Sequence, residues 1–236
     1  RDLDALLHIH VCETQDEGAE LEAQHGGKST IELLAQHGIL DGKVLAAHSV
    51  WVNEEGIETY AQKNVGVAHC PVSNMKLASG AAPVMSMRAA GVEVGLATDG
   101  PASNDDLDLW QEIKFAPLLA RVTALDAATM TPRDALTMAT TEGARVIGNG
   151  DTGVLQIGAK ADFIRLELDN PTFVPVTNDD ELIAHVAWSG SGRHVTDVWV
   201  QGTHVVADRR LTNFDLERAI AEVQTRGLRL AEDSAT

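Results

Sequence analysis

The sequence contains few cysteines, no long apolar segment and few basic residues. Only Cys12 and Cys70 occur among its 236 residues, so a disulfide framework is not indicated and a reducing cytoplasm fits. No apolar run approaches the ~18 residues of a membrane-spanning helix, which excludes that class of protein. The 18 basic residues face 35 acidic ones, giving a net charge of −17. This balance disfavours binding to nucleic acid or to anionic membranes, because both need a basic surface.

The start of the chain suggests a piece of a longer protein. The segment Arg1-Asp2-Leu3-Asp4 has neither a Met nor a signal-peptide pattern, and it leads directly into an apolar run. We therefore expect that the chain begins inside a domain and forms the C-terminal part of a longer protein.

Residues 5–148 alternate short apolar runs with amphipathic segments, a pattern that predicts parallel βα units. The four predicted strands end near Glu13, His48, His69 and Asp99. The predicted helices run from a capping box at Ser29 to Gly38, and over 53–63, 83–90, 106–122 and 132–147. Four such units make half of an eight-stranded barrel. Because half a barrel leaves two exposed parallel edges, we expect the other half upstream or in another chain.

The pattern changes to alternation from about Thr152. Residues 163–168 repeat with a period of two, and 197–206 predict a hairpin with a Gly turn. This predicts a small antiparallel β domain over 151–210. The last segment, 211–236, contains a polar helix from Asp215 to about Glu232.

The first predicted strand carries His8, His10 and, just after it, Glu13. Residues two apart in a strand share a face, so the two histidines are expected to point the same way. Histidine is a common zinc ligand, and a carboxylate that is not needed as a ligand can move protons. A histidine satisfied within the core is the commoner explanation of an isolated His-x-His. The later polar strand ends favour a functional site.

Each of the next three strands also ends at a polar residue, and those ends share the catalytic face of a parallel barrel. His48 could bind a metal or hydrogen-bond its water, or be a structural histidine bonded to a loop carbonyl. His69 is followed at once by Cys70-Pro71; contact with a substrate is an open question, and we do not expect it to bind metal. Asp99 could ligate a cation or cap the next helix, although Asn104 or Asp105 is better placed for capping.

Together these segments resemble a known family. The ordered set HIHVCE, AAHS, GVAHCPVSNMKLASGAAPV and LATDGPASNDD is similar to the amidohydrolase superfamily, and within it to the 5′-methylthioadenosine/S-adenosylhomocysteine deaminases and their s-triazine chlorohydrolase relatives. The resemblance runs from about Leu6 to Ala207. It implies the fifth to eighth strands of a metal-dependent (β/α)8 barrel over 1–150, and part of a small composite β-sandwich over 151–210.

The resemblance also implies roles for particular residues. His10 corresponds to the family's third zinc histidine and Asp99 to its aspartate ligand. Glu13 matches the general acid/base, and His48 matches the histidine that orients the attacking water. Glu13, His48 and Asp99 are thus the expected catalytic residues, with Glu13 and His48 also contacting substrate. The family's first two zinc ligands form an H-x-H on the first barrel strand, and nothing in this chain matches them.

The implied activity is hydrolytic deamination of an aminopurine of the 5′-methylthioadenosine, S-adenosylhomocysteine or adenosine type, with release of ammonia. It implies one Zn²⁺ per subunit, or another divalent transition metal, a small-molecule substrate and a cytoplasmic homo-oligomer. One alternative is a related hydrolase acting on guanine, 8-oxoguanine, a pterin or an s-triazine. Another is a non-catalytic member used for binding or assembly.

Overall fold

The computed structural model describes residues 4–233, so the first three residues of the Arg1–Asp4 segment lie outside it. The chain forms two compact units. The first comprises the chain up to Ala159 together with Asp169–Gly192. The second comprises Lys160–Leu168 and the chain from Arg193 onward. No helix within residues 4–233 combines the length and apolar character needed to cross a membrane.

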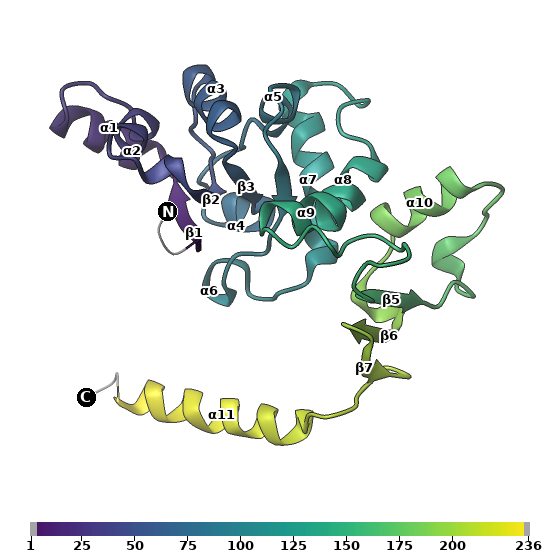
Figure 1. Cartoon of the computed structure of the whole chain (residues 1–236). Coiled ribbons are helices and arrows are strands. Elements are labelled where there is room, and N and C mark those ends of the chain that lie inside the picture. Colours follow the sequence, from purple (N-terminus) through teal and green to yellow (C-terminus); the bar gives the residue numbers. More distant parts are fainter. Residues whose placement is uncertain (1–3, 234–236) are drawn as a thin grey trace. The chain divides into compact units, whose positions relative to one another are not determined.

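The first unit is built on a four-stranded parallel sheet (Figure 1). Its strands pair in chain order and are β1 (Leu6–Val11), β2 (Lys43–His48), β3 (Gly66–His69) and β4 (Val94–Leu96). The prediction of parallel neighbours is confirmed. Among the described residues, β1 and β4 each pair along one edge only.

Helices connect and cover these strands (Figure 1). Their bounds are α1 (Gln15–Gln24), α2 (Thr30–Gln36), α3 (Glu54–Lys63), α4 (Pro71–Lys76), α5 (Val84–Ala89), α6 (Pro101–Asn104), α7 (Leu109–Ala124), α8 (Pro132–Ala139), α9 (Thr141–Val146) and α10 (Asp179–Trp188), with 3-10 turns at Ile39–Asp41 and Pro171–Phe173. The predicted capping box at Ser29 is present, and Asn53 caps α3 as expected.

Some helices differ from their predictions. The helix expected over 132–147 is two helices, because the backbone at Thr140 (φ −124°, ψ −92°) leaves the helical region. Asp108 caps α7, so the expectation that Asn104 or Asp105 caps it was wrong. The helices α1, α4, α6 and α10 have no counterpart among the helices predicted from the sequence. α4 and α6 have six and four residues, too few to show a helical period.

The two faces of the parallel sheet carry different side chains. Val44, Ala46, Val67 and Val94 belong to the main core, which includes residues of the surrounding helices. On the other face, His8 and His10 pair in register with Leu45 and Ala47 of β2. The small side chains of Ala47 and Ala68 on this face leave space above the sheet, where a site can form.

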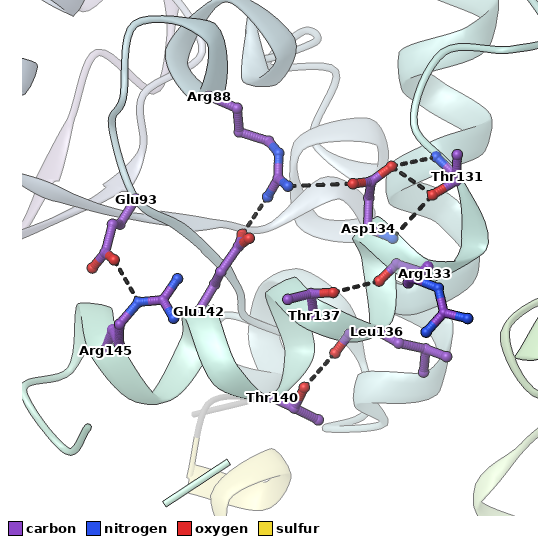
Figure 2. A network of polar contacts seen from close by, with 10 residues as sticks. All are labelled: Arg88, Glu93, Thr131, Arg133, Asp134, Leu136, Thr137, Thr140, Glu142 and Arg145. Carbon is purple, nitrogen blue, oxygen red and sulfur yellow. Dashed lines mark hydrogen bonds and ion pairs between the residues drawn. The ribbon is translucent and has the colours of Figure 1, made fainter. Parts of the chain in front are cut away.

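A network of polar contacts joins three helices on the outside of this unit (Figure 2). The guanidinium of Arg88 on α5 contacts both Asp134 on α8 and Glu142 on α9. Nearby, Arg145 donates to Glu93 at 2.5 Å. These contacts tie the two halves of the broken helix to α5, and they involve none of the predicted site residues.

The second unit is an antiparallel sheet with the strand order β5-β6-β7-β8. Its elements are β5 (Phe163–Leu166), β6 (Val195–Val200), preceded by a 3-10 turn at Gly192–His194, β7 (Thr203–Ala207), β8 (Arg210–Leu211) and the helix α11 (Leu216–Asp233). The predicted hairpin is confirmed. Its turn residues, Gln201 and Gly202, have φ angles of 48° and 78°, as in the hairpin turns that suit twisted strands.

Close packing of α9 against β4 depends on Gly95. A Cβ atom there would lie 2.8 Å from Val146 Cγ2 and 2.9 Å from the Cα of Gly143, both too close for carbon atoms. We expect Gly95→Ala to lower the free energy of unfolding by ~1–3 kcal/mol, the usual effect of overpacking. Urea unfolding measures the change. Gly18→Ala is the matched control: a Cβ added at Gly18 would have no atom within 4 Å, and Ala favours the helix. Equal stability of the two variants would contradict this packing account.

Candidate metal and catalytic site

Three strands of the parallel sheet end in strained backbone. Cys12, His48 and Asp99 have φ angles of 51°, 67° and 62°, in the left-handed region that residues other than glycine rarely adopt. Such residues persist only where the surrounding structure holds them, and they concentrate at functional sites. Here they turn the chain sharply after β1, at the end of β2 and after β4, which brings polar side chains to one edge of the sheet.

His10, His48 and Asp99 meet at this edge. Each offers a ligand atom, and these atoms all lie within 4.8 Å of one another. The rings of His10 and His48 stack, with their centroids 5.2 Å apart and their planes 20° apart. Two imidazole nitrogens and a carboxylate oxygen are typical zinc ligands. The structure thus brings together the two predicted metal ligands and the histidine predicted to lie beside them.

His48 is fully buried and held by Asn74. Its Nδ1 lies 2.9 Å from Asn74 Oδ1, which as an acceptor requires a proton on Nδ1. The lone pair of Nε2 then faces the site, where this buried atom has no hydrogen-bond partner among the described residues. Buried polar atoms without partners are rare. The unsatisfied Nε2 therefore fits a metal ion or a water molecule.

Asp99 is held by serines from two different helices. Its Oδ2 accepts hydrogen bonds from Ser73 of α4 at 2.8 Å and from Ser103 of α6 at 2.5 Å. Partial burial alone would raise the pKa of Asp99, but the hydrogen bonds from Ser103 and Ser73 bring it below the usual aspartate value. The carboxylate is thus kept ionised, as a metal ligand must be.

Glu13 follows the turn at Cys12 and points its carboxylate toward the same place. Its Oε2 lies 3.8 Å from His48 Nε2, and the side chain is 24% exposed. This separation is longer than a hydrogen bond, so a water molecule between the two groups could contact both. A carboxylate in this position can exchange protons with whatever occupies the site.

His69 and His8 do not belong to the group of candidate metal ligands formed by His10, His48 and Asp99. His69 is buried, and burial, with a smaller contribution from nearby His48, lowers its pKa to about 3, so it is neutral. Its Nδ1 has no partner among the described residues. His8 is exposed on the same face of β1 as His10, and both line the cavity above the sheet.

That cavity has a volume of about 600 Å³ and covers the carboxyl ends of the strands. Its lining includes His8, His10, Asp99, Ala47, Ala68, Thr98, Leu107 and Leu109, without a lysine or arginine among the described residues. A second cavity of about 430 Å³ lies at the opposite ends of the strands, and its charged residues are paired, Lys43 with Asp4 and Arg145 with Glu93. Of these two cavities, only the first is lined by His10 and Asp99.

The residues that orient the site side chains through hydrogen bonds were not identified from the sequence. Asn74 and Ser73 follow His69 within a few positions, and Ser103 follows Asp99, yet neither residue type signals a role by itself. Glu112 lies within the helix predicted over 106–122, where its charge is unremarkable. Their proximity to the strand-end residues was the available signal, but their partners come from other elements and depend on the tertiary fold.

Comparison with known proteins places these observations in context. The model of the amidohydrolase family matches residues 1–205. The chain is 42% identical over 226 residues to a 5-methylthioadenosine/S-adenosylhomocysteine deaminase of Pelotomaculum thermopropionicum, covering 96% of this chain and 51% of the relative. It is 42% identical over 223 residues to a 5′-deoxyadenosine deaminase of Methanosarcina acetivorans, covering 94% and 50%. The chain therefore spans about half the length of the curated relatives it matches.

Solved structures show the same partial coverage. A zinc-bound adenosine deaminase from Xanthomonas campestris superposes with a TM-score of 0.92 at 32% identity, covering 98% of this chain and 52% of that one. A zinc complex of atrazine chlorohydrolase from Arthrobacter aurescens gives a TM-score of 0.87 at 29% identity, covering 95% and 49%.

The contact between Asn74 and His48 yields a prediction. Asn74→Leu has a similar volume but removes the acceptor for Nδ1–H, so His48 is no longer fixed. We expect turnover by the complete protein to be about 10–100-fold lower, the usual effect of removing the hydrogen-bond partner that orients a histidine of a metal site. Asn74→Asp keeps an acceptor in place and should retain more turnover than Asn74→Leu. Steady-state kinetics of the two variants make the comparison, and equal activities would contradict the proposed orienting contact.

Proposed function

The chain belongs to the amidohydrolase family, and on that premise we propose that the protein containing it is a zinc-dependent hydrolytic deaminase. Its proposed substrate is an aminopurine of the 5′-methylthioadenosine, S-adenosylhomocysteine or adenosine type. One observation carries the proposal: the ligand atoms of His10, His48 and Asp99 lie within 4.8 Å of one another, with Glu13 beside them. Relatives at about 42% identity named as deaminases of such nucleosides support the substrate class.

The rest of the barrel must complete this site. In residues 4–233 the edges of β1 and β4 that face away from the sheet have no partner strand, and exposed parallel edges are uncommon in natural proteins. We propose that further barrel strands, upstream or in another chain, pair with them and supply the remaining metal ligands. Within residues 151–210, the strands β5, β6 and β7 are proposed to contribute to a composite β-sandwich, whereas Asp169–Gly192 belongs to the first unit. The assembled protein is proposed to be a cytoplasmic homo-oligomer.

The residues present suit a zinc ion. His10 and Asp99 would hold it, and the unpartnered Nε2 of His48 would face the ion or its water. Zinc bound there would act as a Lewis acid that lowers the pKa of water toward neutrality. Two protein ligands seldom hold zinc tightly, which is a further reason to expect ligands from outside this chain.

Glu13 is the proposed proton carrier. Its carboxylate takes a proton from the attacking water and gives it to a ring nitrogen, which makes the adjacent ring carbon electrophilic. His48, fixed through Nδ1 by Asn74, accepts a hydrogen bond from the same water at Nε2 and so sets its direction of attack. A carbon–oxygen bond forms, and Glu13 then carries the proton of the new hydroxyl group to the amino nitrogen. The carbon–nitrogen bond breaks, ammonia leaves, and the ring keeps a carbonyl group next to the protonated ring nitrogen.

The cavity suits a nucleoside without a phosphate group. Its lining combines small apolar residues with the site residues, and the part that this chain supplies offers no lysine or arginine to a phosphate group. A second candidate is a related hydrolase acting on another ring, because the atrazine chlorohydrolase of A. aurescens has a similar fold. A non-catalytic role is the third, although a scaffold has no physical need for this cluster.

The role of Glu13 can be tested directly. Glu13→Gln preserves the shape of the side chain but cannot accept the proton, so we expect zinc content to stay the same and turnover to fall by about 10²–10⁴-fold. His48→Asn should also be strongly impaired. Metal analysis and ammonia release, measured on the complete protein, give the two readouts.

Two other histidines provide the controls for these variants. His25 and His37 are exposed residues at the ends of α1 and α2, away from the cluster, so His25→Asn and His37→Asn should be close to neutral. Normal turnover in Glu13→Gln would refute the mechanism and leave only the metal site.

A substrate panel separates the candidate functions. We expect ammonia release to be fastest with 5′-methylthioadenosine, S-adenosylhomocysteine or adenosine, measured beside guanine, 8-oxoguanine and a pterin, with chloride release measured for a chloro-s-triazine. Faster hydrolysis of one of the latter rings would favour the second candidate. Zinc binding without turnover of any compound would favour the third.

A further inference from the structure

A buried carboxylate lies behind the site. Glu112 on α7 is fully buried, with 0% of its surface exposed. Its Oε2 accepts a hydrogen bond from the backbone N–H of Val72 at 3.1 Å, and its Oε1 accepts one from Asn104 Nδ2 at 2.7 Å. One side chain thus joins the first turn of α4 to the end of α6.

The two residues that Glu112 holds are the chain neighbours of the two serines on Asp99. Val72 precedes Ser73, and Asn104 follows Ser103; both serine hydroxyls donate to Asp99 Oδ2. Asn104 Nδ2 also donates to the carbonyl oxygen of Thr98 at 2.6 Å, directly before Asp99. Glu112 therefore binds the sequence neighbour of each serine that donates a hydrogen bond to Asp99.

The geometry explains why such a link is needed. Asp99 has a left-handed backbone, which has to be held by its surroundings. α4 and α6 are too short to be rigid alone. At the surface, Lys76 Nζ also lies 2.7 Å from Asp105 Oδ2 and 3.5 Å from the carbonyl oxygen of Ala102, but exposed polar contacts of this kind contribute little. The buried carboxylate is the stronger constraint.

Burial of the ionised Glu112 side chain away from water is energetically unfavourable. Burial raises the pKa of Glu112 to about 7, although the hydrogen bonds from Val72 and Asn104 act in the opposite direction. Well-packed apolar residues often stabilise a core as well as buried charges do. Stability alone does not account for a glutamate here, whereas an acceptor with two oxygens is what the Val72 and Asn104 donors require.

We propose that Glu112 is a positioning residue that fixes Asp99 for metal binding by holding Val72 and Asn104, and through them Ser73 and Ser103. The inference deepens the proposed function because it concerns the same site. It assigns no contact with substrate to Glu112, whose effect passes through the backbone on either side of the two serines.

The test compares two glutamates in the complete protein. Glu112→Gln has nearly the same volume but replaces one acceptor oxygen by an NH₂ group, so one of the two donors loses its partner. We expect about 10–100-fold weaker zinc affinity in competition with a chelator, the range for groups behind a metal ligand, and a lower kcat with little change in KM. Zinc affinity is measured whether or not the enzyme turns over.

Glu142→Gln is the matched control. Glu142 is also largely buried and binds Arg88, in a network that includes none of the three cluster residues (Figure 2). We expect this variant to unfold at a lower urea concentration and to bind zinc like the wild type. If Glu112→Gln only lowers stability, as Glu142→Gln does, and leaves zinc affinity and kcat unchanged, the proposal is overturned.

A second variant keeps the proposal testable if Glu112→Gln does not fold. Asn104→Ala removes only the arm that joins Glu112 to Thr98 and should weaken zinc binding in the same direction. Unchanged zinc affinity in folded Asn104→Ala would overturn the positioning role. Weaker zinc binding in a protein that deaminates none of the panel would support the positioning role while refuting the proposed substrate class.

Discussion

The parallel register of β1 to β4 is the constraint on which the site depends. It places Val11 beside His48 and His69 beside Leu96, so that neighbouring strands end at the same level. His10 lies one residue before the end of β1, and Asp99 three residues after the end of β4. A shift of one residue in β1 would turn His10 to the other face of the sheet, and a shift in β4 would move Asp99 along the sheet away from His10. The register of the strands therefore determines whether His10 and Asp99 lie close enough to share a metal ion.

The side chains of His48 and Asp99 are oriented by residues that are not themselves candidate ligands or catalytic groups. Left-handed backbone at His48 and Asp99 directs their side chains, and this strain has to be offset by contacts nearby. Asn74 fixes the ring of His48, while Ser73 and Ser103 fix Asp99. These partners come from the short helices α4 and α6, which α7 in turn supports. The chemistry and the packing of this edge are consequently coupled.

Much of this arrangement could be predicted from the sequence, for physical reasons. The strands could be recognised because each is a short apolar run followed by a polar residue, and α2 and α3 because Ser29 and Asn53 cap them. α4 and α6 could not, since a helix of one or two turns has no period to detect. The break at Thr140 and the contacts of Asn74 and Glu112 depend on partners distant in sequence, which local patterns do not encode. The candidate site residues could therefore be identified from the sequence, whereas the residues that orient them could be identified only from the tertiary structure.

The central claim of the proposal is that this chain contributes His10 and Asp99 to one metal ion. Anomalous diffraction at the zinc edge, from crystals of the complete protein, tests it most directly. The account predicts a single strong peak at about 2.0–2.2 Å from a ring nitrogen of His10 and a carboxylate oxygen of Asp99, the usual zinc–ligand distances, with His48 Nε2 facing the ion or its water. A zinc peak that contacts neither His10 nor Asp99 would contradict it.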